Sequence, residues 1–285
     1  MGISQTEKDF IKKGVLSDIR TDGRTRKKAR EFNVDINPLP QASGSARVMM
    51  DMTDIVVGVK IDLSSPKIDS PNQGYVSVSV DCASSAFETL DPSYDPQNIS
   101  TDLSRYLTNI LMTKECINLK KLCIIPRQQC WVLYVDVLLL SYGGNIHDSA
   151  LLALRYSLEN AKIPSVKFGD DGMAFEISND IDSYESIEID GVPLSFTFAQ
   201  IGDGIVIDPS VAEELAAQTC LSIAINRRNQ VVYMQSRGRG SIKHNILLDI
   251  MKAAQNNAIE TFNNYKNTLA ESKNRKSVGF LAVGV

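Results

Sequence analysis

The segment at residues 130–140 constrains the fold more than any other part of the chain. It reads CWVLYVDVLLL, and Asp136 is its single charged residue. A nearly continuous apolar run of this length is typical of a central strand buried on both faces of its sheet. It is too short for a membrane-spanning helix, which needs about 20 apolar residues. We therefore expect a strand at the centre of a large sheet.

Other segments show the two periods of secondary structure. Residues 75–80 (YVSVSV) alternate as in a half-buried strand, and residues 102–112 place apolar side chains at helical spacing. Ser100 or Thr101 is the expected N-cap of that helix, and Asp148 that of a helix ending near residue 161. Further strands are predicted at 46–50, 54–62, 121–125, 174–177, 186–189, 194–201, 205–207, 220–226 and 231–236, and further helices at 3–16 and 246–269.

Each half of the chain therefore reads as several strands followed by a helix, which suggests a duplication at the level of the fold. The pattern predicts an α/β or α+β protein with mixed sheets. The length of 285 residues fits one large domain or two small ones.

The composition excludes several classes of protein. The hydrophobic content of 43% and the charged content of 22% are those of a globular protein. The net charge of −4 argues against a surface that binds nucleic acid all over. The five cysteines include no CxxC pair, so we expect no zinc cluster. The first eleven residues are polar and unlike a secretory signal, which predicts a cytosolic or nuclear protein.

Charged and glycine-rich segments have a simple structural interpretation in most cases. The basic runs at residues 20–30 and 273–276 are interpreted as solvated segments. Residues 202–204 (GDG) are expected to form a hairpin turn. For residues 237–240 (RGRG), a hairpin turn and a contact to a phosphate backbone through Arg237 and Arg239 remain equally open.

Few residues offer catalytic chemistry. His147 and His244 are the only histidines, and His147 follows a glycine pair where a polar loop residue is the commoner outcome, although the position can also project into a pocket. Asp208 and Glu214 could converge on one metal or one proton-transfer site if the chain turns back between them. Acidic residues are also common at helix starts, and we prefer that interpretation.

Several motifs together resemble the RNase PH superfamily. They begin with R-x-DGR at residues 20–24 and continue, in order, at 43–48, 53–60, 71–75, 80–82, 130–140 with Gly143-Gly144-Asn145, and 206–210 with Glu213-Glu214. The pattern looks most like the eukaryotic exosome ring subunit related to the non-catalytic archaeal ring protein. The resemblance implies an α+β, RNase PH-like fold of two similar β-rich halves with mixed sheets packed by helices. It also implies four segments, at residues 1–30, 31–165, 166–271 and 272–285.

The resemblance further implies that the chain is inactive. Phosphorolytic members cleave RNA from its 3′ end with inorganic phosphate, and an arginine after the glycine pair helps to form their phosphate site. Here Ile146 stands at that position and cannot donate a hydrogen bond. Asp208 is retained, but the second aspartate position carries Glu214, whose extra methylene shifts the carboxylate. We expect no catalytic residues, no metal and no cofactor.

The implied role is assembly of a ring with other RNase PH-like subunits, as a heterodimer within six subunits. RNA-binding cap proteins would sit on one face, RNA would pass through the central channel, and no membrane is involved. The family implies location in the nucleus, nucleolus and cytoplasm. An active phosphate-dependent exoribonuclease and a free-standing scaffold without an RNA role are the alternatives. The candidate RNA contacts are Arg105, Lys114, Lys120, Lys121, Arg127, Arg237 and Arg239.

Overall fold

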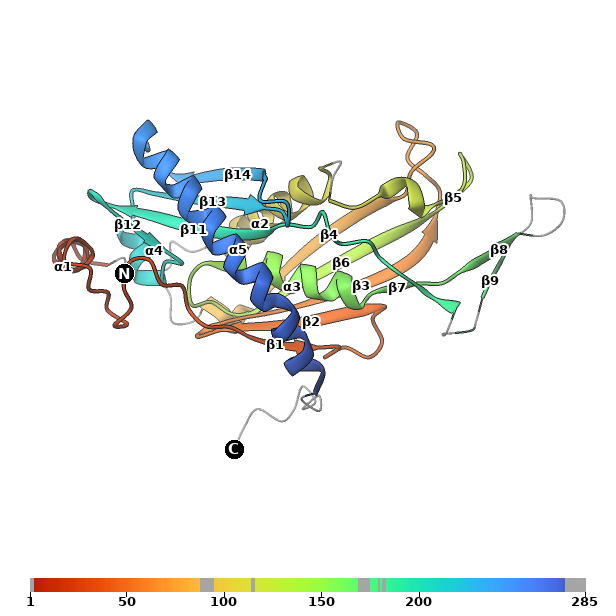
Figure 1. Ribbon diagram of the computed structural model, residues 1–285, viewed down its shortest axis with the longest axis horizontal. Helices are drawn as coiled ribbons and strands as arrows, with labels where there is room; N and C mark the ends of the chain where they lie inside the picture. Colours follow the sequence, from red (N-terminus) through yellow and green to blue (C-terminus); the bar gives the residue numbers. More distant parts are fainter. Residues whose placement is uncertain are drawn as a thin grey trace.

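The computed structural model describes residues 3–87, 95–113, 116–168, 175–178, 180 and 183–274. Two sheets dominate the fold, one from each half of the sequence. Helix α3 (Ile146–Asn160) lies between them, in contact with strands of both (Figure 1). This arrangement confirms the predicted α+β class. Among the described helices, none combines the length and the apolar character needed to cross a bilayer.

The first sheet has six strands in the order β1-β2-β3-β6-β4, and β5 pairs with the start of β6. β6 runs parallel to β4 and antiparallel to β3, so the sheet is mixed, as predicted. The sequence did not predict β1. The strands are β1 (Asn33–Ile36), β2 (Gly44–Met50), β3 (Thr53–Ser64), β4 (Tyr75–Cys82), β5 (Cys123–Ile125) and β6 (Gln129–Ser141).

The expectation that residues 130–140 are buried on both faces is wrong. β6 is central in the sheet, but Tyr134, Asp136 and Leu138 are exposed while the residues between them are buried. Tyr134 and Leu138 are each 37% exposed. Because both side chains are largely apolar, the alternation of buried and exposed residues is not visible in the sequence. One face of the first sheet therefore faces solvent, as is common in sheets that are largely antiparallel.

Helix α2 (Pro96–Leu111) begins earlier than predicted. Its N-cap is Asp95, whose carboxylate accepts a hydrogen bond from the backbone N–H of Gln97, and Pro96 occupies the first helical position. Ser100 and Thr101, the predicted caps, lie inside the helix. The short 3₁₀ helices beside it are η1 (Ser84–Phe87) and η2 (Leu119–Leu122), and η2 occupies the start of the strand predicted at 121–125.

Helix α3 also begins earlier than predicted. Its N-cap is Asn145, in the left-handed conformation with φ 53°, and not Asp148, which lies in the first turn. Asn tolerates this conformation better than most residues. The helix start therefore lies directly after the glycine pair, next to the end of β6.

The second sheet is antiparallel throughout, in the order β12-β11-β13-β14. Residues 202–204 form the predicted hairpin, with Gly202 at φ +63°. Two small ladders lie between the two sheets in sequence: β7 pairs with β10, and β8 pairs with β9. The strands are β7 (Lys162–Ile163), β8 (Val166–Phe168), β9 (Phe175–Ile177), β10 (Glu185–Ser186), β11 (Leu194–Ile201), β12 (Gly204–Ile207), β13 (Thr219–Ile225) and β14 (Val231–Gly238).

Helix α5 (His244–Asn274) crosses the molecule from the second sheet to β1 and extends beyond the predicted residue 269 (Figure 1). Arg155 of α3 lies 5.0–5.1 Å from the ring centroids of Tyr265 and Phe262 on α5. The hydroxyl of Tyr265 donates to Glu159 at 2.5 Å. These contacts fix the outer half of α5 to the central helix. Of the segment predicted at residues 272–285, residues 272–274 belong to α5 and residues 275–285 lie outside the described residues.

Helix α1 (Gln5–Leu16) packs with α4 (Val211–Ala216) against β11 and β12, and forms a second, smaller core around Ile11 and Val15. A capping box between Ser4 and Glu7 begins α1. The sequence predicted α1 but not α4. The N-terminal helix therefore packs against the second half of the chain, although it precedes the first half in sequence.

Candidate functional site

Buried arginines bind the N-terminal arm, residues 17–32, to the second half. Arg20 is 3% exposed and pairs with Glu213, with Nη2 and Oε2 2.5 Å apart. Arg24 and Arg30 pair with Asp208 at 2.9 and 2.8 Å. The interpretation of residues 20–30 as a solvated segment is therefore wrong for these three arginines. The R-x-DGR motif has a structural role here, because both of its arginines contact acidic residues of the second half.

The carboxylate of Asp208 is saturated with hydrogen bonds. Oδ2 accepts from Arg24 Nη1 and from the backbone N and Nε of Arg30, and Oδ1 accepts from Arg30 Nη2 and Asn145 Nδ2, all at 2.7–2.9 Å. A carboxylate has about four lone-pair sites, so none is left for a metal or a substrate. Burial acts to raise the pKa of Asp208, but the hydrogen bonds and charge of Arg30 outweigh it, and the pKa lies below its ordinary value.

Glu214 occupies the N-terminal end of α3. Its Oε1 accepts a hydrogen bond from the backbone N–H of Asn145 at 3.1 Å, and its Oε2 accepts from the hydroxyl of Tyr142 at 2.5 Å. Unpaired N–H groups and the helix dipole make such an end a site for anions. In this chain a carboxylate of the protein itself takes that place.

Asp208 and Glu214 converge as the sequence suggested, but on Asn145. One binds its side-chain amide and the other its backbone N–H. Glu214 lies in the first turn of α4, so the helix-start interpretation is confirmed for Glu214 but not for Asp208, which precedes the N-cap Ser210. Across the described residues, no group of three or more His, Cys, Asp or Glu side chains is arranged to hold a metal ion.

Gly144 allows the start of α3 to lie close to the start of α4, because it has no side chain. Its φ is +90°, and a Cβ atom there would lie 2.7 Å from the backbone nitrogen of Val211. The carbonyl oxygen of Gly144 accepts from the hydroxyl of Thr53 and from Arg30. The glycine pair therefore joins β3, the N-terminal arm and α4 at one point.

A cavity of 340 Å³ opens beside Glu214, and Ile146 and His147 line it. Ile146 contributes an apolar surface with no donor. The charged groups of the wall are three carboxylates and one guanidinium, and this excess of negative charge disfavours the binding of a doubly charged anion. The lining residues are Asp95, Asn98, Ile99, Asp102, Tyr142, Ile146, His147, Glu214, Ala217, Thr219, Cys220, Arg237 and Gly238.

His147 is buried in the cavity wall, and the preferred interpretation as a polar loop residue is wrong. It is 1% exposed, with Nε2 3.4 Å from Asp102 and its ring edge-on to Tyr106 at 4.7 Å. Burial, helped by the charge of Arg237, lowers its pKa to about 4. The imidazole is therefore neutral at pH 7 and adds no positive charge to the cavity.

Comparison with known proteins identifies the architecture. Residues 28–164 match the 3′ exoribonuclease family, domain 1 (RNase_PH), and residues 191–257 match domain 2 of the same family (RNase_PH_C). The chain belongs to the RNase PH family. The RNase PH-like part of the predicted fold class is thereby confirmed.

The relatives of this RNase PH protein include components of exosomes. It is 32% identical to the exosome complex component Rrp42 of Sulfurisphaera tokodaii, over 84% of this chain and 86% of the relative. It is 29% identical to Rrp42 of Methanopyrus kandleri, over 90% and 95%. A chain in the structure of the Archaeoglobus fulgidus exosome with RNA bound to the active site superposes with a TM-score of 0.76 and 26% identity, covering 91% of this chain and 98% of that one.

Arg237 and Arg239 of this RNase PH protein do not lie in a hairpin turn. β14 ends at Gly238, and the chain then leads into α5, so that alternative is wrong. The side chain of Arg237 points into the cavity, where its Nε and Nη2 atoms are buried without a hydrogen-bond partner among the described residues. Arg239 is exposed. Contact of either with a phosphate backbone stays a prediction.

The remaining RNA candidates that the structure describes are surface residues on α2, on η2 and in the β5–β6 turn. Arg105 on α2 borders a shallow groove rich in serine and threonine, and Lys120 and Arg127 are exposed on η2 and on the β5–β6 turn. Lys121 is exposed but forms an ion pair with Glu188 at 2.8 Å. Lys114 lies outside the described residues. Their role in RNA binding stays a prediction.

Three residues of the site were missed from the sequence. Arg30, Asn145 and Tyr142 hold the two acidic residues in place, yet each is an ordinary polar residue when read alone. The signal that could have found Asn145 is its position after the glycine pair. No local signal marks Arg30, whose partner lies 178 residues away.

Proposed function

We propose that this chain is a non-catalytic ring subunit of an RNA exosome. It would pair with other RNase PH-like subunits, close a six-subunit ring with them, and form part of the channel for RNA in 3′–5′ processing and degradation. RNA-binding cap proteins on one face of the ring are part of this proposal. The names of its relatives and of its structural neighbours support it.

One observation carries the proposed inactivity: the chain's own side chains use the groups that phosphorolysis would require. Glu214 neutralises the N-terminal end of α3, and Asp208 is saturated by arginines of the N-terminal arm. Ile146 supplies no donor to the cavity. A phosphate ion would have to displace or approach these carboxylates in a confined space, which is electrostatically unfavourable.

A phosphorolysis assay tests the inactivity. Purified chain is incubated with RNA, magnesium and inorganic phosphate, and release of nucleoside diphosphates is measured. We expect no release from the wild type, and none from Ile146→Arg, because Glu214 still occupies the helix end. Robust phosphate-dependent shortening of RNA by the wild-type chain would refute the proposal and favour the alternative, an active exoribonuclease.

The RNA-path role needs a separate test in the assembled ring. Alanine substitution of three of the exposed candidates should weaken RNA protection and reduce the salt dependence of binding, by about 0.7 in the log–log slope for each lost phosphate contact with single strands. A triple alanine variant at exposed lysines of other surfaces is the matched control and should bind RNA as the wild type does. Unchanged binding by the first variant would refute this choice of RNA-contacting residues. The first variant changes Arg105, Lys120 and Arg127, and the control changes Lys13, Lys162 and Lys252.

Location in the nucleus, nucleolus and cytoplasm forms part of the same proposal and is checked by imaging a tagged chain. The division at residues 30, 165 and 271 also stays a prediction, which limited proteolysis tests. Cleavage concentrated near these boundaries would support it.

A further inference from the structure

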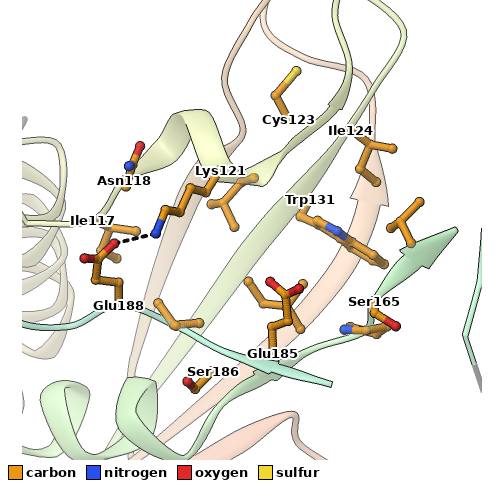
Figure 2. Close-up of a pocket in the computed structure, with 15 residues that line it drawn as sticks. Ile117, Asn118, Lys121, Cys123, Ile124, Trp131, Ser165, Glu185, Ser186 and Glu188 are labelled. Carbon is orange, nitrogen blue, oxygen red and sulfur yellow. Dashed lines mark hydrogen bonds and ion pairs between the residues drawn. The ribbon is translucent and has the colours of Figure 1, made fainter. Parts of the chain in front are cut away.

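A second pocket lies beside β5, which pairs with β6 of the first sheet. It shares no residue with the cavity beside Glu214. It opens between η2 and β5 on one side and the β7–β10 ladder on the other (Figure 2). Its volume is 260 Å³. The lining residues are Ile117, Asn118, Lys121, Leu122, Cys123, Ile124, Trp131, Ile163, Pro164, Ser165, Val166, Glu185, Ser186, Ile187 and Glu188.

The inner wall of this pocket is apolar and aromatic. Trp131 of β6, which is 6% exposed, lies against it, and Leu122 and Ile187 are buried beside it. Trp131 is the only tryptophan of the chain. An indole ring is the best aromatic surface for a cation, and the aliphatic side chains around it suit a methylene stem.

The rim of the pocket is acidic. Glu188 pairs with Lys121 at 2.8 Å across the opening. The side chain of Glu185 has no hydrogen bond or ion pair with any described residue, and Figure 2 shows its carboxylate pointing into the pocket, toward Trp131. Two carboxylates therefore face one ammonium group, which leaves an uncompensated negative charge beside the indole ring.

We propose that this pocket receives an arginine side chain from an extended segment of a partner protein. The planar guanidinium would lie against the ring of Trp131 and form paired hydrogen bonds with the carboxylate of Glu185. Its methylene groups would contact Leu122 and Ile187. Each part of the pocket thus meets the part of an arginine side chain that it complements.

The surroundings favour a protein segment over a small molecule. The volume is below the about 300–1,000 Å³ of typical small-molecule sites. Ile117, Asn118 and Glu188 also border an adjoining depression of 860 Å³, so a chain can continue past the pocket. Within the described part, β5 pairs with β6 alone and β10 with β7 alone, so each leaves an edge for main-chain hydrogen bonds.

Because Trp131 is the sole tryptophan, its fluorescence reports on this pocket alone. The probe is the peptide acetyl-Gly-Thr-Arg-Thr-Gly-amide, titrated into the full-length chain. The controls are the same peptide with citrulline, which has nearly the same shape without the charge, and with lysine. We expect a saturable change with the arginine peptide, none with the citrulline peptide, and weaker binding with the lysine peptide.

Two variants locate the interaction. Glu185→Gln should weaken binding of the arginine peptide at least about tenfold, whereas Glu176→Gln, an exposed glutamate on β9, should leave it unchanged. Matching thermal melts of both variants would show that the fold is intact. The proposal is overturned by the absence of a saturable signal up to about 10 mM peptide. Equal binding of the citrulline or lysine peptide, or an unaffected Glu185→Gln variant, overturns it too.

Discussion

Replacing Asp208 by asparagine should destabilise this chain strongly. Asp208 is 2% exposed, and the side chains of its partners Arg24 and Arg30 are only 11% and 7% exposed. Asparagine keeps the shape but removes the charge, so the buried guanidinium of Arg30 loses its counter-ion and that of Arg24 keeps only Asp22, which is 2.7 Å away. Removing one member of a buried ion pair costs about 3–5 kcal/mol. At about 2–4 °C per kcal/mol, the melting temperature should fall by roughly 6 to 20 °C.

Urea unfolding followed by circular dichroism measures this loss, and its pH dependence identifies the cause. The pKa of Asp208 is lowered in the fold, mainly by Arg30 acting against burial. A lowered pKa contributes stability above the unfolded value of about 3.9, and that stability is lost as the pH falls through the folded value. The difference between wild type and Asp208→Asn should therefore persist from pH 7 to about pH 4 and shrink below.

Asp190→Asn is the matched control, because the ion pair of Asp190 with Arg227 has side chains 77% and 49% exposed. Its effect should stay within about 0.5 kcal/mol. An Asp208→Asn variant as stable as the wild type, or more stable, would refute the structural role. Such a result is typical of a residue retained for chemistry at the expense of stability, and would favour an active site here.

Two further predictions concern the same region. His147 has a pKa of about 4 in the fold, so its neutral form stabilises the protein above about pH 6.5, and up to roughly 3 kcal/mol should be lost as the pH falls toward 4. His147→Gln should reduce the loss of stability over this pH range, whereas the exposed His244→Gln should not. Equal dependence of stability on pH in the two variants would contradict the lowered pKa of His147. Gly144→Ala should destabilise far more than Gly23→Ala, because both have positive φ but only Gly144 has backbone atoms within 3 Å of the added carbon. Equal melting temperatures of the two variants would contradict the close packing.

The sequence predicted the larger elements because their periodicity is strong. The alternation in β4, the helical spacing in α2 and the long amphipathic α5 were each recognisable. Several short elements were missed, among them β1, α4, β7 and β8, whereas β9 and β12 were predicted to within one residue. β6 was misjudged because Tyr134 and Leu138 are apolar side chains on a solvated face, and no local pattern reveals which face is covered.

The sequence predicted the acidic residues of the site and Ile146, but not the contacts that hold them together. Their motifs mark Asp208 and Glu214, and the sequence allows the two side chains to converge. It does not indicate that they converge on Asn145. Asn145 acts through a left-handed backbone conformation that its sequence neighbours do not fix. The arginines of residues 20–30 were read as solvated because charge runs usually are, and their burial depends on partners from the other end of the fold.

The distance in sequence between the N-terminal arm and its partners has a consequence for biosynthesis. Arg30 is made 178 residues before Asp208. At about 5–20 residues per second of translation, the arm waits roughly 10–35 s for its counter-ion. The first sheet can collapse during that interval, but α3 cannot be fixed at its start until β12 and α4 have emerged. We therefore expect the nascent chain to expose a basic arm and an unfinished central helix to chaperones until its second half leaves the ribosome.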